Sequence, residues 1–196
     1  MNQKVIDHFR KYDPIIYSYA VRIGQVQIDS SSDHFINLCE SIINQQLSEK
    51  AGATIFHRFQ QAFKGKISPK NVASLSSERL RSTGISLSKI GYLKGLAKGV
   101  LEKKLVLEML LDLPNEKVIE ELTKIKGIGR WTAEMFLMFS LGREDIFSYG
   151  DLGLRRAIEK LYKLENPSKE HLGEISQKWS PYRTYACIVL WRSLKL

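Results

Sequence analysis

The stretch KIKGIGRWTAEMF, residues 124–136, limits the possible folds of this chain more than any other part of the sequence. Two glycines enclose Ile128, and the large side chain of Trp131 follows them. Because glycine adopts backbone angles that other residues avoid, the stretch predicts a tight turn at 125–129. Apolar residues at helical spacing predict one helix before the turn and one after it. They are Val118, Ile119 and Leu122 before the turn, and Ala133, Phe136 and Leu137 after it.

Helical spacing of apolar residues continues along most of the chain. Ser48 precedes one apolar stripe as a helix N-cap, and Ser68 with Pro69, and later Pro114, begin two further helices. The alternation typical of β-strands does not appear, and the connections are short. We therefore predict a compact all-α protein. Its last three helices are expected at 151–163, 168–179 and 182–194.

The charge of the chain indicates an anionic partner. There are 30 Lys plus Arg residues and 21 Asp plus Glu residues, so the formal net charge is +9. Nucleic acid is the commonest such partner, although a lysine-rich protein without one has the same composition. Cys39 and Cys187 form no zinc or iron–sulfur pattern, which suits a reducing interior. The sequence shows neither the apolar stretch of a signal peptide nor a run long enough to span a membrane.

The predicted hairpin has the features of a phosphate-binding site. The first amide groups of a helix have no intrahelical partner, and the helix dipole favours an anion there. Lys124, Lys126 and Arg130 add positive charge around this helix start. A purely structural corner between two helices needs the glycines but not the three cations. The pattern therefore favours phosphate binding over the structural alternative.

Longer segments relate the chain to a known family. LTKIKGIGRWTAEMF resembles the helix-hairpin-helix of DNA glycosylases in which a catalytic aspartate follows the hairpin. Other segments, in the same order, resemble the 3-methyladenine DNA glycosylase II branch of that superfamily, and the match lacks the extra N-terminal β-domain of some members. These segments are NQQLSEKAGATIFHRF (44–59), GISLSKIGYLKGLA (84–97), GDLGLRRA (150–157) and WSPYRTYACIVLW (179–191).

The resemblance implies an architecture of two helical lobes within one compact unit. A cleft between the lobes is expected to hold Asp151. The expected ranges are 1–196 for the whole unit, about 33–143 for the lobe with the hairpin at 125–129, and about 1–32 plus 144–196 for the other lobe.

The resemblance also assigns two ligands to the hairpin. In the family, its main-chain amides hold the DNA backbone and its carbonyl oxygens often bind a monovalent cation. No cofactor is expected to be required. The expected DNA contacts are Lys126, Gly127, Ile128, Gly129 and Arg130, and the expected ligands of a sodium or potassium ion are the carbonyl oxygens of Thr123, Ile125 and Gly127.

Asp151 matches the catalytic aspartate of the family, and general chemistry supports that role. Breaking the bond between base and sugar builds positive charge on the sugar, which an ionised carboxylate beneath it stabilises. The same carboxylate can orient or deprotonate an attacking water. Asp151 also precedes a predicted helix, so helix capping alone is the alternative, and the residues by themselves favour it. The two roles are compatible, and the resemblance favours catalysis.

Trp131 decides the expected type of reaction. Bifunctional relatives have a lysine at this position, which attacks the sugar and leads to strand cleavage. An indole ring cannot form that intermediate. We therefore predict a monofunctional glycosylase that uses water as the nucleophile, leaves an abasic site and has no lyase activity. The missing C-terminal cysteine set argues against the iron–sulfur members of the superfamily.

Aromatic residues are expected to hold the extruded base. Alkylated purines such as 3-methyladenine and 7-methylguanine carry positive charge, which aromatic faces attract. Trp131 and Trp191 align with pocket aromatics of the branch, although Trp191 in ACIVLW also suits a core position. Tyr149 is a further candidate because it is close to Asp151 in sequence. Met135 replaces an aromatic of the best-known members, so the pocket is expected to differ in selectivity.

The space left by an extruded base needs a wedge. The segment GISLSK lies where the family places a wedge loop, so Leu87 is the expected wedge and Lys89 an expected phosphate contact. The alternative is that Leu87 packs into the core. Gln45 and Gln46 either contact the base or satisfy buried backbone groups, and the sequence does not separate these roles.

The function predicted from the sequence is hydrolysis of the N-glycosidic bond of alkylated purines in DNA by base flipping. The alternatives are a non-catalytic helix-hairpin-helix DNA-binding module and a glycosylase for deaminated purines such as hypoxanthine. The expected partner is double-stranded DNA with alkylated bases, bound by a monomer without membrane association. We expect a cytoplasmic, nucleoid-associated protein in a prokaryote and a nuclear one in a eukaryote.

Overall fold

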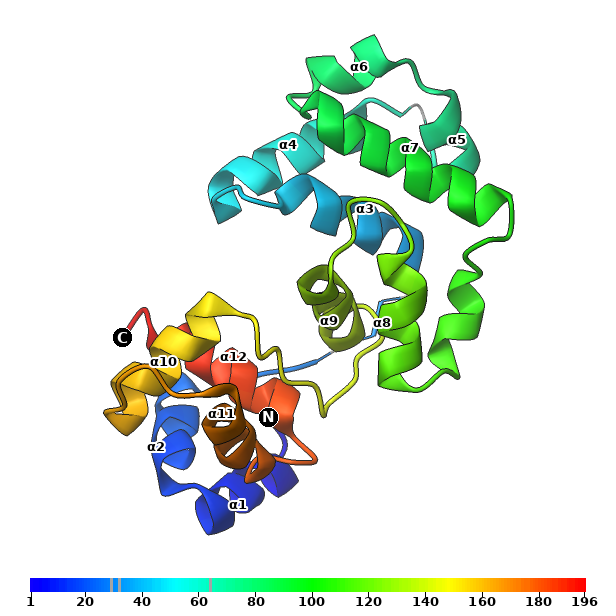
Figure 1. Cartoon of the computed structure of the whole chain (residues 1–196). Helices are drawn as coiled ribbons and strands as arrows, with labels where there is room; N and C mark the ends of the chain where they lie inside the picture. The colour runs from blue at the N-terminus through cyan, green and yellow to red at the C-terminus, as the bar shows by residue number, and fades with distance from the viewer. Residues whose placement is uncertain (29, 32, 64) are drawn as a thin grey trace. The chain divides into compact units, whose positions relative to one another are not determined.

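The computed structural model of the chain describes residues 1–28, 30–31, 33–63 and 65–196. Throughout these residues the secondary structure is helical, without a strand, so the predicted all-α class is confirmed (Figure 1). None of the helices has the length and apolar content needed to cross a membrane within the part of the chain described. The helices are α1 (Gln3–Tyr12), α2 (Pro14–Ile23), α3 (His34–Asn44), α4 (Glu49–Gln61), α5 (Pro69–Ser74), α6 (Ser77–Ser82), α7 (Leu87–Leu101), the 3₁₀ helix η1 (Leu107–Leu111), α8 (Asn115–Thr123), α9 (Arg130–Phe139), α10 (Leu152–Tyr162), α11 (Lys169–Gln177) and α12 (Arg183–Ser193).

Capping side chains explain many of the helix boundaries. Ser48 caps α4, and Ser68 caps α5 with Pro69 at the first helical position, as the sequence predicts. The helices α1 and α2 are not among those predicted from the sequence. These two helices begin after Asn2 and Asp13, whose side-chain oxygens accept hydrogen bonds from amides of the first turn. Short polar residues thus set the helix starts in both parts of the chain.

Contacts divide the chain into two units, which are described separately. Unit 1 consists of Met1–Ser30 and Gly142–Leu196, and unit 2 consists of Ser31–Leu141. The lobe boundary expected between residues 32 and 33 involves Ser32, which lies outside the described residues. The single compact unit with a cleft between two lobes stays a prediction.

Unit 2 is built around α3. This helix packs against α4, α7 and α9, and α8 packs against α9. Burial of each large apolar side chain stabilises such a core by about 1.5–3 kcal/mol. Because α3 contacts so many neighbours, the polar residues along it have fixed positions within the unit. Fully buried members of the core include Leu38, Ile42, Ile43, Phe59, Leu93, Leu96, Val118 and Leu122.

In unit 1, the buried carboxylate of Asp13 links the N-terminal helices to the C-terminal half of the chain. In this unit α2 packs against α1 and α12, and α10 packs against α12. Asp13 Oδ1 accepts hydrogen bonds from the amides of Ile15 and Ile16. Its Oδ2 accepts hydrogen bonds from the Tyr162 hydroxyl at 2.5 Å and from Trp179 Nε1 at 2.8 Å. These donors compensate the loss of hydration of a buried carboxylate and tie the N-terminal helices to the C-terminal half of the chain.

The connection from α9 to α10 is held against α12. Arg183 Nε donates to Asp145 Oδ1 at 2.7 Å, and the Ile146 amide donates to Thr184 Oγ1 at 3.0 Å. Burial acts to raise the pKa of Asp145, but the hydrogen bonds from Arg183 hold this pKa below its ordinary value. These contacts fix the segment that leads into Asp151.

Candidate active site and nucleic-acid interface

The two glycines of the hairpin meet different demands. Gly127 has a φ angle of +95°, and a Cβ atom there would lie 2.2 Å from Tyr92 Cγ. Gly129 has an ordinary φ of −90°, and in the described structure a Cβ there would meet no atom within 4 Å. Ile128 between them is 4% exposed and anchors the turn in the core. Gly127 is therefore required by the fold, whereas Gly129 leaves open space at the start of α9.

The end of α3 is bonded to the hairpin through Gln45, whose role the sequence leaves open. Gln45 Nε2 donates to the Gly127 carbonyl oxygen at 2.8 Å and to Thr132 Oγ1 at 3.3 Å. Lys89 Nζ donates to the carbonyl oxygens of Ile43 at 2.8 Å and Gln45 at 2.6 Å, and burial lowers its pKa. Lys89 thus provides hydrogen bonds to carbonyl oxygens at the C-terminal end of α3. Its contact with a DNA phosphate stays a prediction.

The cations of the hairpin differ in their partners. Arg130 forms a two-bond ion pair with Glu116 at 2.7 and 3.0 Å, and its Nε donates to Glu134 at 3.0 Å. The hydrogen bonds to Glu116 raise the pKa of Arg130. Lys124 pairs with Glu121, and Lys126 is exposed. Carboxylates already bind the Arg130 guanidinium, so this side chain is less available for the DNA contact that the sequence predicts, and that contact stays a prediction.

Two of the three carbonyl oxygens expected to bind a monovalent cation also accept hydrogen bonds. The Ile125 oxygen accepts one from the Ile128 amide at 3.0 Å, and the Gly127 oxygen accepts the one from Gln45. A carbonyl oxygen has a second lone pair, and carbonyl oxygens are suitable ligands for potassium or sodium. The donor set fits such an ion, which the carbonyls of Thr123, Ile125 and Gly127 would hold. The ion itself stays a prediction.

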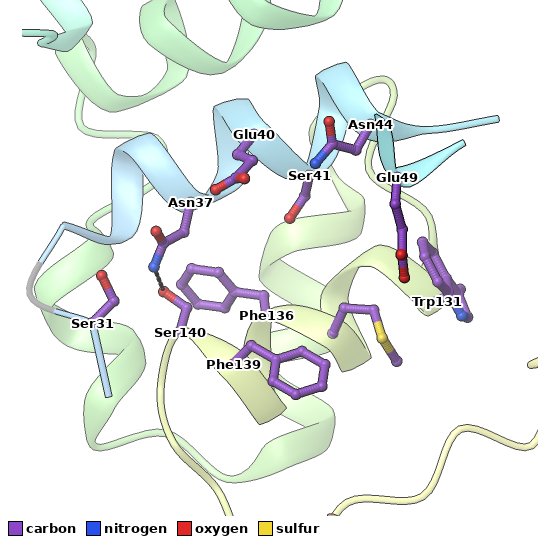
Figure 2. A pocket seen from close by; sticks show the side chains of 11 residues that line it. Ser31, Asn37, Glu40, Ser41, Asn44, Glu49, Trp131, Phe136, Phe139 and Ser140 are labelled. Atoms are coloured by element: carbon purple, nitrogen blue, oxygen red, sulfur yellow. Dashed lines mark hydrogen bonds between the residues drawn. The ribbon is translucent and has the colours of Figure 1, made fainter. Parts of the chain in front are cut away.

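Unit 2 contains a cavity of about 570 Å³ between α3 and α9 (Figure 2). Two residues expected at the base pocket, Trp131 and Met135, line it together with Phe136 and Phe139 from the same helix. Trp131 and Phe139 are each 45% exposed, although both are large aromatic residues. The volume is in the range of small-molecule sites and accommodates a purine.

Asp151 lies at the start of α10 in unit 1 and is 9% exposed. Its Oδ1 accepts a hydrogen bond from the Leu154 amide at 2.7 Å, so the capping role that the sequence suggests is present. Trp191 Nε1 donates to the same oxygen at 3.0 Å. Trp191 therefore contacts the proposed catalytic carboxylate directly through its indole N–H.

Gly153 makes the approach of Trp191 to Asp151 possible. A Cβ atom on Gly153 would lie 3.1 Å from Asp151 Oδ1 and 3.2 Å from Trp191 Cδ1. Both distances are tighter than ordinary contacts, so a side chain there would displace one of the partners. Sequence reasoning missed this residue. Its signal was a glycine in the first turn of a helix, two positions after the aspartate.

Tyr149 is engaged within unit 1. Its hydroxyl lies 3.4 Å from Ser176 Oγ, its ring packs edge-on against Phe147 at 4.8 Å, and Lys169 Nζ lies 5.9 Å from the ring centroid. Its place in a base pocket stays a prediction.

Two large apolar residues at or next to expected site positions are exposed. Leu87, the first residue of α7, is 71% exposed, so the alternative that it packs into the core is wrong. Leu152, directly after Asp151, is also largely exposed and was missed by sequence reasoning, because it does not differ in type from core leucines. Gln46 is exposed with a φ of +56°, a backbone conformation that turns the chain sharply before α4.

Comparison with known proteins relates this geometry to DNA repair. Residues 39–181 match the family described as HhH-GPD superfamily base excision DNA repair protein. The chain is 37% identical to DNA-3-methyladenine glycosylase 1 of Schizosaccharomyces pombe over 81% of this chain and 72% of that protein. It matches the structure of the S. pombe 3-methyladenine DNA glycosylase Mag1 in complex with abasic DNA, with a TM-score of 0.89, 32% identity and coverage of 99% and 98%. A DNA-3-methyladenine glycosidase structure from Bacillus halodurans matches with a TM-score of 0.84, 38% identity and coverage of 98% and 89%.

The two hairpin glycines should respond differently to alanine. Gly127→Ala is expected to destabilise unit 2 by about 2–4 kcal/mol in urea unfolding, because it adds backbone strain and a clash with Tyr92. Gly129→Ala should change stability by less than about 1 kcal/mol, since its Cβ meets open space. The methyl group of Gly129→Ala should nevertheless weaken the binding of duplex DNA, measured by fluorescence anisotropy, because it obstructs the close approach of a phosphate. Equal loss of stability in both variants, or unchanged binding by Gly129→Ala, would contradict this division.

Proposed function

Because the chain belongs to the HhH-GPD superfamily of base excision DNA repair proteins, we propose that it is a DNA glycosylase that hydrolyses the N-glycosidic bond of alkylated purines. The names of its relatives agree with this reaction, since several are 3-methyladenine DNA glycosylases. The observation that carries the proposal is the carboxylate of Asp151, which two N–H donors orient at the start of a helix. The protein is expected to act as a monomer wherever the chromosomal DNA of its organism lies.

Asp151 acts on the sugar of the damaged nucleotide. As the bond to the base breaks, positive charge develops on the sugar, and an ionised carboxylate stabilises it. The Leu154 amide and the Trp191 indole hold Oδ1 in place, so the carboxylate does not have to reorient during the reaction. The carboxylate also orients or deprotonates the attacking water.

The cavity of unit 2 receives the extruded base. Trp131, Phe136 and Phe139 supply aromatic surface along it. Alkylation at N3 or N7 leaves the purine positively charged, so the ring interacts favourably with aromatic faces and departs readily as a neutral base. The reaction therefore needs no partner acid beside Asp151 for such substrates.

The nucleophile is water rather than an amino group. Trp131 occupies the position after the hairpin where bifunctional relatives carry lysine, and its indole cannot form a Schiff base. The product is an abasic site in an intact strand. The open surface at Gly129 and the first amides of α9 hold a phosphate of the DNA backbone during this step.

Replacement of Asp151 tests the catalyst. Asp151→Asn keeps a good N-cap residue, so the helix start should persist while the negative charge is lost. Release of 3-methyladenine and 7-methylguanine from methylated DNA, followed by chromatography, should fall about 100-fold or more. Wild-type protein should yield abasic sites and no borohydride-trapped adduct with DNA. An Asp151→Asn variant with the wild-type rate would refute the assignment, and a wild-type protein that binds DNA but releases no base would favour the non-catalytic module. Preferential release of hypoxanthine would favour the deaminated-purine alternative.

Trp191 is a positioning residue for Asp151, and a second tryptophan provides a matched control. Trp191→Phe removes the N–H donor but keeps an aromatic ring, so kcat should fall about tenfold or more while KM for methylated DNA changes little. Trp179→Phe removes a comparable bond to Asp13 in the core of the same unit, and should lower stability without a selective loss of kcat in the folded protein. Gly153→Ala should reproduce the kcat defect of Trp191→Phe. The positioning role would be contradicted if, in Trp191→Phe, Trp179→Phe and Gly153→Ala alike, activity fell only in proportion to the loss of stability.

The wedge role of Leu87 predicts an effect that depends on the DNA structure. Leu87→Ala should reduce base release from duplex DNA about tenfold, because the extruded base then leaves an unfilled gap in the stack. Release from single strands should change little, since no stack has to be maintained. Leu101→Ala, at the other end of α7 and also exposed, is the matched control and should affect neither substrate. Equal losses on duplex and single strand would disprove the wedge.

A further inference from the structure

The cavity of unit 2 is anionic although the chain as a whole is strongly cationic. Its lining includes the carboxylates of Glu40 and Glu49, and among the described lining residues there is no lysine or arginine. The formal net charge of the chain is +9. A phosphate group entering this cavity would meet like charge, so the cavity is unsuited to the DNA backbone. It is suited to a ligand that carries positive charge.

Glu40 lies on the α3 wall of the cavity and is only partly exposed. Burial raises the pKa of its carboxyl group, and a hydrogen bond with Asn44 lowers it. The loss of hydration therefore disfavours the ionised form of Glu40 by more than the neutral amide of Asn44 favours it. A carboxylate in this situation gains more from a cationic ligand than a fully hydrated one does.

Asn44, one turn after Glu40, is held in an unusual way. Its Oδ1 is buried and accepts no hydrogen bond from the described residues. The space that it occupies exists because residue 52 is glycine, since a Cβ on Gly52 would lie 2.5 Å from that oxygen. Asn44 also lines the cavity, although this oxygen is packed against Gly52 and does not face the cavity (Figure 2).

The wall opposite Glu40 is aromatic. Figure 2 shows Glu40 and Ser41 on α3 across the cavity from Phe136 and Phe139 on α9. Flat apolar surface on one side and a desolvated carboxylate on the other suit a planar, positively charged ring. A neutral purine makes the same stacking contacts without the charge interaction.

From these observations we propose that Glu40 is the residue that selects cationic over neutral bases after extrusion. The proposal rests on the function proposed above and names its preferred substrates, purines with a formal positive charge from alkylation of a ring nitrogen. Glu40 does not touch the bond that breaks. It favours entry of the charged ring into the cavity of unit 2.

The chemistry places this selectivity in binding rather than in bond cleavage. When the glycosidic bond breaks, its electron pair moves to the base and the positive charge moves to the sugar. The attraction between Glu40 and the ring therefore weakens as the transition state is approached. Interactions that are stronger in the ground state than in the transition state do not raise kcat. Removing the charge of Glu40 should weaken capture of a cationic base without a comparable loss of maximal rate.

The test compares Glu40→Gln with Glu108→Gln. Both remove one negative charge, but Glu108 is exposed on η1 and does not line the cavity, so it controls for the general attraction to DNA. Binding is measured by anisotropy on duplexes with a single 2′-fluoro-7-methylguanine, a 2′-fluoro-hypoxanthine nucleotide or undamaged guanine, since fluorine at C2′ slows cleavage. Relative to Glu108→Gln, Glu40→Gln should bind the 7-methylguanine duplex about fivefold or more weakly and the other two within about twofold.

Single-turnover rates on unfluorinated 7-methylguanine DNA complete the test. At saturating enzyme, Glu40→Gln should stay within about threefold of the control. The proposal would be overturned if Glu40→Gln and Glu108→Gln bound the 7-methylguanine duplex equally well, or if Glu40→Gln weakened binding to all three duplexes equally. It would also be overturned if Glu40→Gln lowered the single-turnover rate by a larger factor than it lowered the affinity. These failures differ from failure of the proposed function, which would leave the wild-type protein unable to release any alkylated base.

Discussion

Two hydrogen bonds to one oxygen of Asp151 determine what the rest of the site can do. The Leu154 amide and the Trp191 indole both donate to Oδ1, so the carboxylate begins α10 and has a fixed orientation. The proposed reaction needs a carboxylate to stabilise a developing cation on a sugar, and a carboxylate is also a good cap for a helix start. The structural and chemical demands on Asp151 therefore agree. Gly153 belongs to the same arrangement, because a Cβ atom there would crowd both the indole and the carboxylate.

In unit 2, a single helix connects the hairpin that we propose to bind the DNA backbone with the cavity that we propose to receive the base. The C-terminal end of α3 is bonded to the hairpin through Gln45 and to α7 through Lys89. The same helix carries Glu40 and Asn44 on the wall of the cavity. The open backbone at Gly129 and the base cavity are thus connected by a few hydrogen bonds within one unit. A shift of α3 would therefore alter both at once.

The sequence predicted those features that depend on local pattern. Helical class, the starts of α4 and α5, the hairpin and the family follow from spacing, capping residues and ordered motifs, and all are confirmed. Features that depend on contacts between distant residues were not predictable. The bond from Trp191 to Asp151 joins residues forty positions apart, and an apolar run such as ACIVLW does not reveal which indole N–H has a partner. Similarly, the pairing of Arg130 with Glu116 depends on how α8 and α9 cross, so the guanidinium looked more available in the sequence than it is. Glu40 resembled any polar residue of an amphipathic helix until the cavity beside it was known.

The opposite signs of charge in the chain and in the cavity suit successive stages of one process. A net charge of +9 attracts any DNA, damaged or not, and this attraction carries no information about the base. In the proposed reaction the cavity receives only a base that has left the stack, and the carboxylate of Glu40 in its wall disfavours phosphate and gives neutral purines no charge interaction. Because binding energy from the aromatic wall is common to all purines, discrimination has to come from a group that responds to charge. A half-buried carboxylate is the simplest such group, and its placement away from Asp151 in sequence lets selection and bond cleavage be adjusted by separate substitutions.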